Sequence, residues 1–246
     1  MIQQLLAKLG YSIVRIDSQA SRLPVLYSLA EIEELERDLD KLRTTGRDFN
    51  GWDSRKTVRT YLTNDRINFY HELIEICIRY GLDFSQSRIL DSGTCTGYLL
   101  RILDKKFPDC SLHGCDYQDM FVNLSSALVP RARIFKGNVL KLNSSVRYDL
   151  IFCTEVLEHI RDTETPIPTI LNLLSDGGSL VVTVPNGRCD NSEAEGLLED
   201  GISYVGHVNF WSPESWKFYI ERISGPVRAI TGTLQGGSKL FAIIKK

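Results

Sequence analysis

From residue 87 onward, the sequence alternates short apolar runs with stretches of helical spacing. Strand-length runs separated by helices of about ten residues are typical of βαβ units, in which a helix connects two parallel strands. The last two runs have only Gln-Gly-Gly-Ser between them, which predicts a hairpin and so an antiparallel final strand. The seven expected strands cover residues 88–93, 111–116, 132–138, 148–153, 178–186, 225–234 and 239–246.

The expected fold is therefore α/β, with a mostly parallel seven-stranded sheet in residues 85–246 and a helical extension in residues 1–84. In the extension, residues 28–42 place apolar side chains at helical spacing on an otherwise charged helix. That face needs a partner, either the main domain, on which the extension would form a lid, or a second copy in a homodimer. Its apolar positions are Leu29, Ile32, Leu35, Leu39 and Leu42.

The composition is that of an ordinary globular protein, with 43% hydrophobic residues, 24% charged residues and a net charge of -2. The chain as a whole therefore lacks the excess of positive charge that is typical of proteins that bind nucleic acid. The six cysteines show no Cys-x-x-Cys spacing and read as reduced thiols. No apolar run reaches the roughly 20 residues that span a bilayer, and the polar N-terminus does not resemble a secretion signal. We expect a cytoplasmic protein.

A glycine loop, Leu-Asp-Ser-Gly-Thr-Cys-Thr-Gly-Tyr, joins the first strand to its helix. Such a loop brings a ligand close to backbone amides at a helix N-terminus. A dinucleotide site would have a middle glycine where this chain has Cys95, and the preceding Asp91 would repel a pyrophosphate. An acid at that place suits a ligand with a cationic amino acid end. Asp116, at the tip of the second strand, is placed to accept hydrogen bonds from ribose hydroxyls.

These motifs resemble those of the class I S-adenosylmethionine-dependent methyltransferases, whose first motif is approximately Asp/Glu-x-Gly-x-Gly-x-Gly. The resemblance covers about residues 87–246 and implies a Rossmann-like, doubly wound sheet. It also implies that the methionine part meets Asp91 and the glycine loop, the ribose meets Asp116, and the adenine meets Tyr117 and Asn138. The cofactor-binding residues that it implies are Asp91, Gly93, Thr94, Gly97, Asp116, Tyr117, Asn138, Val139 and Thr154.

Glu155, Glu158 and His159 follow the fourth expected strand at positions i, i+3 and i+4. If a helix or tight turn starts at Glu155, the three side chains share one face on the ligand side of the sheet. Three interpretations stay open. The acids and the imidazole could be local caps bonded to backbone, or His159 could be the general base of a catalytic pair with Glu155. The third interpretation is a metal site.

The metal interpretation comes from a further resemblance. The spacing Glu-x-x-Glu-His is similar to that of the small-RNA 2′-O-methyltransferases and the ubiquinone-pathway O-methyltransferases, and in the RNA enzymes a downstream histidine completes the site. His207 stands at the equivalent place in this chain. The resemblance implies Mg²⁺ or Mn²⁺ held by Glu155, Glu158, His159 and His207, where the ion would lower the pKa of an acceptor hydroxyl.

The long polar segment 186–211 follows the fifth expected strand, where it would cover a substrate pocket together with the extension. Residues 206–216 resemble the corresponding stretch of ubiquinone-type and sugar-modifying methyltransferases. We therefore expect O-methylation of a sugar, a glycan or another small hydroxylated acceptor. Two alternatives remain: an RNA 2′-O-methyltransferase with a metal site, against which the lack of a basic or aromatic platform argues, and a non-catalytic methyltransferase-like scaffold.

Overall fold

The computed structural model of the protein describes residues 64–192, 201–203, 206–225 and 228–246. Within these ranges, the part from Glu72 to the last residue folds as one unit. Most of the expected N-terminal extension, including the apolar face of residues 28–42, lies outside the described residues, so its role as a lid or a dimer contact stays a prediction. The described end of the extension is helix α4 (Asn64–Arg79). None of the helices in the described ranges has the length and hydrophobicity needed to cross a bilayer.

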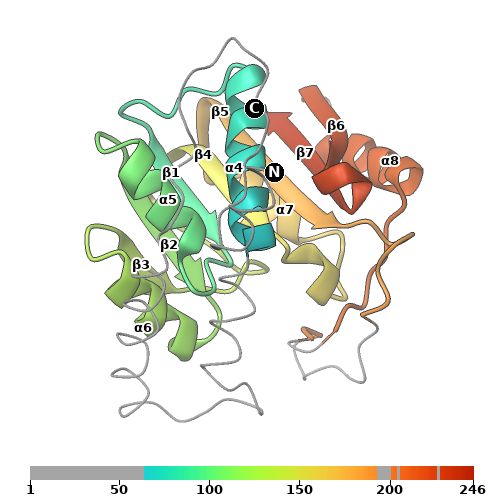
Figure 1. The fold of residues 1–246 in the computed structure, drawn as a ribbon, viewed down its shortest axis with the longest axis horizontal. Helices are drawn as coiled ribbons and strands as arrows, with labels where there is room; N and C mark the ends of the chain where they lie inside the picture. Colours follow the sequence, from blue (N-terminus) through green and yellow to red (C-terminus); the bar gives the residue numbers. More distant parts are fainter. Residues whose placement is uncertain (1–63, 193–200, 204–205, 226–227) are drawn as a thin grey trace, which may run out of the picture. The chain divides into compact units, whose positions relative to one another are not determined.

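The centre of the fold is a seven-stranded sheet with the strand order β3-β2-β1-β4-β5-β7-β6 (Figure 1). Strand β7 is antiparallel to both of its neighbours, β5 and β6, and the other neighbouring strands are parallel. The expected mostly parallel sheet with an antiparallel final strand is confirmed. The strands are β1 (Arg88–Ser92), β2 (Ser111–Asp116), β3 (Arg133–Lys136), β4 (Tyr148–Thr154), β5 (Leu174–Pro185), β6 (Arg228–Leu234) and β7 (Lys239–Lys245).

The strand order reverses between β1 and β4, because the chain runs outward from β1 through β2 to β3 and then returns to the other side of β1 at β4. In doubly wound sheets, ligands bind at this switch point, outside the carboxyl ends of the strands. The topology therefore places the ligand side at the loops that follow β1, β2, β3 and β4.

Helices lie in most connections between the strands, whereas the connection from β3 to β4 is a loop. Helix α8 begins where Ser212 forms a capping box with Ser215, whose backbone amide donates to the Ser212 hydroxyl at 3.2 Å, and where Pro213 occupies the first turn. The helices are α5 (Tyr98–Lys106), α6 (Asp119–Leu128), α7 (Pro166–Leu171) and α8 (Pro213–Ser224), with short 3₁₀ turns η1 (Leu157–His159) and η2 (Gln235–Gly237).

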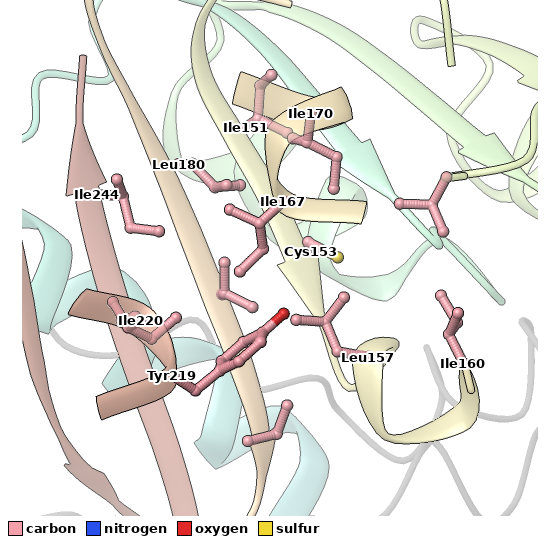
Figure 2. Close-up of a cluster of buried hydrophobic side chains, with 14 of the residues drawn as sticks. Ile151, Cys153, Leu157, Ile160, Ile167, Ile170, Leu180, Tyr219, Ile220 and Ile244 are labelled. Carbon is pink, nitrogen blue, oxygen red and sulfur yellow. The ribbon is translucent and has the colours of Figure 1, made fainter. Parts of the chain in front are cut away.

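A buried apolar cluster lies between the strands β4 and β5 and the helices α7 and α8 (Figure 2). Leu157 and Ile160, from the turn η1 and the residue after it, are each 2% exposed and belong to this cluster. Burial of one such side chain contributes about 1.5–3 kcal/mol. The Tyr219 hydroxyl, in the same cluster, donates to the Thr163 carbonyl at 2.7 Å. The core thus anchors the turn that follows β4 and fixes the direction of its polar side chains.

Candidate active site

The glycine loop after β1 is folded back onto the end of β2. The backbone amides of Gly93 and Thr94 both donate to the carbonyl of Cys115 at 2.9 Å, and the amide of Gly97 donates to the carbonyl of Thr94 at 2.8 Å. Gly93 has φ = +86°, and a Cβ at this position would overlap Cγ2 of Val156. The loop therefore needs glycine at residue 93 for its backbone angle and for the close approach of the segment after β4.

Cys95 replaces the middle glycine of the family motif, yet its backbone keeps a glycine-like conformation. Its φ is +47°, in the left-handed region, which costs a residue with a Cβ about 1–2 kcal/mol. Its amide donates to Oδ2 of Asp116 at 2.9 Å. The loop thus retains the shape of the glycine motif, and the left-handed angles of Gly93 and Gly97 on either side show that both flanking turns are kept.

Asp91 carries a buried carboxyl group near the carboxyl end of β1, with the Thr94 side chain as a hydrogen-bonding neighbour. Its side chain is 2% exposed, and Oδ1 has no hydrogen-bond partner among the described residues. Burial raises the pKa of Asp91 to about 7, and the charge of nearby Asp116 adds to the rise. An unsatisfied buried carboxyl oxygen is costly, so this group is arranged to receive a donor, and a cation would lower its pKa again.

Asp116 ends β2 and is held by backbone amides on both oxygens. Cys95 donates to Oδ2 at 2.9 Å and Gln118 donates to Oδ1 at 3.0 Å. Burial nevertheless raises the pKa of Asp116 to about 6. Each carboxylate oxygen has a second lone pair, so both can still accept hydrogen bonds from a pair of hydroxyl groups. The two amides therefore fix the orientation of the Asp116 carboxylate before any ligand binds.

The remaining residues that the sequence assigns to the cofactor lie along the same edge of the sheet. Asn138 follows β3, and its Oδ1 accepts the amide of Leu140 at 2.9 Å, which closes a local turn and leaves one lone pair. The amide of Gly137 donates to the carbonyl of Asp116 at 2.9 Å, so the ends of β2 and β3 are joined. Val139 and Thr154 are buried, and half-buried Tyr117 packs against the apolar cluster.

The segment after β4 differs from the sequence expectation at Glu155. The residue has φ = +56°, and the helical geometry is limited to the turn Leu157–His159, so Glu155 does not share a helical face with Glu158 and His159. Its carboxylate accepts the Thr183 hydroxyl at 3.1 Å and forms an ion pair with Lys239 at the start of β7. The expectation of one common face was wrong because it assumed α-helical angles from Glu155 onward.

Glu158, His159 and His207 do come together. Each offers one possible ligand atom, and these atoms all lie within 4.8 Å of one another. Glu158 is 1% exposed, and its Oε1 is 4.0 Å from Nε2 of His159. The two imidazole rings are 4.8 Å apart between centroids and meet edge to face. Residues that are 48 positions apart in the chain thus form one group beside the carboxyl end of β4.

Both histidines of this group use Nδ1 as a hydrogen-bond donor. Nδ1 of His159 lies 2.9 Å from the carbonyl of Gly206, and Nδ1 of His207 lies 2.5 Å from Oδ2 of Asp190. Carbonyl and carboxylate oxygens only accept, so each Nδ1 carries a proton, and in the neutral imidazole Nε2 is then the nitrogen with the lone pair. Burial would raise the pKa of Asp190, but hydrogen bonds from His207 and Ser192 outweigh this effect and the pKa lies below its usual value.

The segment between β5 and α8 is hydrogen-bonded to backbone carbonyls in and next to the turn η1. The amide of Val208 donates to the carbonyl of Glu158 at 2.8 Å, and the amide of Ser203 donates to the carbonyl of His159 at 2.7 Å. The Asn209 side chain donates to the carbonyl of Ile160 at 2.6 Å. These contacts bring His207 to His159. The residues that sequence reasoning missed here are Asp190 and Lys239, since neither belongs to a recognisable motif.

A family model described as a methyltransferase domain matches residues 30–223, which is most of the chain. The chain belongs to this methyltransferase-domain family. The strand order, the glycine loop and the two acids identify it as a class I S-adenosylmethionine-dependent methyltransferase, as the sequence resemblance implied. The family match begins well before β1, so it includes part of the N-terminal extension.

Two curated relatives share stretches of this methyltransferase domain. The trans-aconitate 2-methyltransferase of Pseudomonas paraeruginosa is 30% identical over 105 residues, which is 43% of this chain and 38% of that protein. The malonyl-(acyl-carrier protein) O-methyltransferase of Priestia megaterium is 30% identical over 139 residues, or 55% of this chain and 50% of that protein. The matches thus span half or less of the length of these relatives.

Solved structures share the fold at low sequence identity. The plantazolicin methyltransferase BpumL, in complex with SAH, superposes with a TM-score of 0.63 at 16% identity over 88% of this chain and 98% of that chain. The N-methyltransferase NodS from Bradyrhizobium japonicum, also in complex with SAH, gives a TM-score of 0.55 at 18% identity over 87% and 97% of the two chains.

The described residues fit S-adenosylmethionine on their own chemistry. The Oδ1 atom of Asp91 is a buried acceptor with no hydrogen-bond partner among the described residues, and a carboxylate of this kind suits a cationic amino acid end. Asp116 offers two oriented oxygens to the ribose.

Proposed function

We propose that the protein is an S-adenosylmethionine-dependent O-methyltransferase whose acceptor is a sugar or another small hydroxylated molecule. The observation that carries this proposal is the group of Glu158, His159 and His207, in which a carboxylate oxygen and one ring nitrogen of each histidine lie within 4.8 Å of one another. A carboxylate and a neutral imidazole nitrogen can each take a proton, so the group suits an acceptor that arrives with a hydroxyl proton.

At the cofactor end, the roles follow from burial and charge. When bound, S-adenosylmethionine supplies a methyl group on a positively charged sulfur. Asp91 accepts hydrogen bonds from the ammonium group, and its carboxylate is stabilised by that charge. Asp116 accepts the ribose hydroxyls through oxygens that the amides of Cys95 and Gln118 already orient. Holding both ends of the cofactor fixes the direction in which the methyl group faces.

At the acceptor end, His159 is the general base. The Gly206 carbonyl holds the proton on its Nδ1, so in the neutral imidazole Nε2 is the nitrogen that would take the proton of a hydroxyl group. His159 is also the most exposed member of the group, with 27% of its side chain accessible, whereas Glu158 is buried beneath it. Removal of the hydroxyl proton makes the oxygen a better nucleophile toward the methyl group.

The same group argues against a free carboxylate as the acceptor at this position. A carboxylate acceptor is already ionised at neutral pH and needs no base. One relative is named for trans-aconitate and another for malonyl-(acyl-carrier protein). This chain is therefore expected to differ from those relatives in the chemistry of its acceptor.

A metal-assisted reaction is the second candidate, because the same three residues carry carboxylate and imidazole ligands. Glu158, His159 and His207 would hold Mg²⁺ or Mn²⁺, and an RNA 2′-hydroxyl would then be an eligible acceptor. Around an ion with bonds of about 2.1 Å, ligands at right angles lie about 3 Å apart. The ligand atoms spread over up to 4.8 Å, so they would have to close around an ion, whereas the base mechanism needs no such movement.

The test combines a binding measurement with an acceptor screen. Calorimetry should detect binding of S-adenosylmethionine and of its demethylated product. Mass spectrometry should detect methylation in pools of nucleotide sugars, phenols, small carboxylic acids and short RNAs. Methylation of hydroxyl compounds supports the proposal. Methylation of carboxylic acids alone overturns the acceptor class, and cofactor binding without any methylation favours the scaffold alternative.

The base and metal candidates separate in the same assay. His159→Asn keeps a donor for the Gly206 carbonyl but removes Nε2, and it should lower turnover by roughly 10²–10⁴-fold while cofactor binding survives. His113→Asn, on β2, is the control for loss of a histidine outside the site. Activity that vanishes with a chelator and returns with Mg²⁺ or Mn²⁺ would replace the base mechanism with the metal one.

A further inference from the structure

Asp190 and His207 form a buried pair that the sequence motifs do not predict. Oδ2 of Asp190 lies 2.5 Å from Nδ1 of His207, and the two side chains are only 8% and 16% exposed. Both residues lie in the segment between β5 and α8, 17 positions apart in the chain. Their contact therefore holds the early part of this segment against its later part. A charged side chain at this depth is normally satisfied by specific partners, and this one has an imidazole.

Backbone contacts hold the pair in place from both sides. The second oxygen of Asp190, Oδ1, accepts the amide of Ser192 at 3.0 Å, and the carbonyl of Ser192 accepts the amide of His207. Ser192 therefore bonds to both members. The carboxylate cannot rotate away from the imidazole without breaking one of these bonds, so the relative orientation of the two groups is fixed.

We propose that Asp190 is the positioning residue for His207: it holds the proton on Nδ1 and so directs the Nε2 lone pair to the acceptor site. This inference rests on the proposed function, since His207 belongs to the group that acts on the acceptor. Asp190 is not itself a member of the group of Glu158, His159 and His207. It acts through the imidazole, as carboxylates do when they set the tautomer of a catalytic or metal-binding histidine.

The two histidines of the group thus have different partners with the same effect on the tautomer. A neutral carbonyl, that of Gly206, orients His159, whereas a carboxylate orients His207. A carboxylate stabilises an imidazolium more strongly than a carbonyl does. The hydrogen bond that orients His207 is therefore charge-assisted, whereas the one that orients His159 is to a neutral group.

The test is the tautomer of His207, read from the ring ¹⁵N chemical shifts in mildly alkaline solution, where an ordinary histidine is neutral. The chain has 4 histidines, so His207→Asn assigns the signal of His207 by its disappearance. The full-length wild-type protein should show His207 protonated on Nδ1. Asp190→Asn should move it toward the tautomer protonated on Nε2, because the amide group of asparagine can donate to Nδ1.

The matched control is Asp162→Asn, which alters a loop aspartate whose Oδ1 accepts the amides of Glu164 and Thr165. It should leave the histidine signals unchanged. In activity assays, Asp190→Asn should lower kcat roughly 10–100-fold with the KM for S-adenosylmethionine unchanged, and Asp190→Glu should restore part of the loss.

Two results would overturn the proposal: a wild-type His207 protonated on Nε2, or an Asp190→Asn protein whose His207 tautomer does not change. The wild-type spectrum decides the matter even if Asp190→Asn does not fold. The tautomer measurement needs no acceptor, so it also remains decisive if the acceptor screen finds no substrate, which is the result that overturns the proposed function instead.

Discussion

The backbone amide of Cys95 donates a 2.9 Å hydrogen bond to Oδ2 of Asp116. This bond joins the glycine loop after β1 to the acid that ends β2, so the two parts of the proposed cofactor site are held together. The amide of Gln118 holds the other oxygen at 3.0 Å. Asp116 therefore serves the protein and the ligand at the same time, and a change at this residue should affect both.

Replacement of Asp116 by asparagine should weaken S-adenosylmethionine binding by tenfold or more. The amide has only one accepting oxygen, so it can satisfy Cys95 or Gln118 but not both, and it loses the charge-assisted hydrogen bonds to the ribose, each contributing on the order of 1.5–3 kcal/mol. Calorimetry measures the loss. Asp119→Asn, an exposed acid paired with Lys136, is the matched control and should bind normally. Unchanged affinity in Asp116→Asn would refute the assignment of this acid.

Binding of S-adenosylmethionine should release protons at about pH 6. The pKa of Asp91 is raised to about 7 in the ligand-free fold, whereas an unfolded aspartate titrates near 3.9. The folded state therefore binds more protons, and stability from this group is fully present below the unfolded pKa and is lost as the pH rises toward 7. An ammonium group beside Asp91 reverses the shift, so affinity should rise with pH over this range.

The proton release can be measured by calorimetry in two buffers of different ionisation enthalpy. Asp91→Asn should reduce the number of protons released and weaken binding at neutral pH. Part of the release should remain, because burial also raises the pKa of Asp116, to about 6. A release that is the same in Asp91→Asn as in the wild type would show that Asp91 does not meet the cationic end of the ligand.

Gly93→Ala should damage the site far more than Gly177→Ala. Both glycines have left-handed angles, with φ of +86° and +77°. A Cβ at Gly177 meets nothing within 4 Å, so Gly177→Ala isolates the backbone strain, about 1–2 kcal/mol. A Cβ at Gly93 adds an overlap with Val156. Urea unfolding and cofactor titration of both variants measure the difference, and equal losses would mean that the approach of Val156 is not tight.

The ion pair between Glu155 and Lys239 should stabilise the end of β4. Lys239→Met leaves the Glu155 carboxylate, which is 9% exposed, without this cation, and should cost about 2–3 kcal/mol. The double variant Glu155→Gln with Lys239→Met should recover part of the loss, since no buried charge then remains. A double-mutant cycle on the free energy of unfolding gives the coupling. Additive effects would indicate that the pair contributes nothing.

Most of the fold was predictable because each strand is a short apolar run and each helix has a regular apolar spacing. The one marked difference is β5, which begins at Leu174, four residues before the expected strand. There the pairing with β4 shifts between Tyr148 and Leu150. The intervening Ser-Asp-Gly-Gly has the composition of a turn, and the sequence alone does not distinguish a turn from a bulge that continues the strand.

The candidate site was predictable only where family motifs mark it. The spacing of Glu158 and His159 and the downstream His207 could be read from the sequence, but the left-handed angle that turns Glu155 away could not, because glutamate rarely adopts it. Asp190 and Lys239 were missed for a different reason. Each acts through a contact that depends on the three-dimensional path of the chain, and nothing in their neighbouring residues marks it.

The position of β6 outside β7 has a consequence for the order of folding. Strand β6 is synthesised first, yet it pairs with β7, and β7 pairs with β5. Within the described sheet, β6 has no partner until β7 has emerged, so the two should form a hairpin that docks on β5 as a unit. This docking brings Lys239 to Glu155 and places the Ser238 carbonyl 2.9 Å from the amide of Asn186. The contacts of Lys239 and Ser238 on the ligand side of the sheet can therefore form only after the ribosome has synthesised β7.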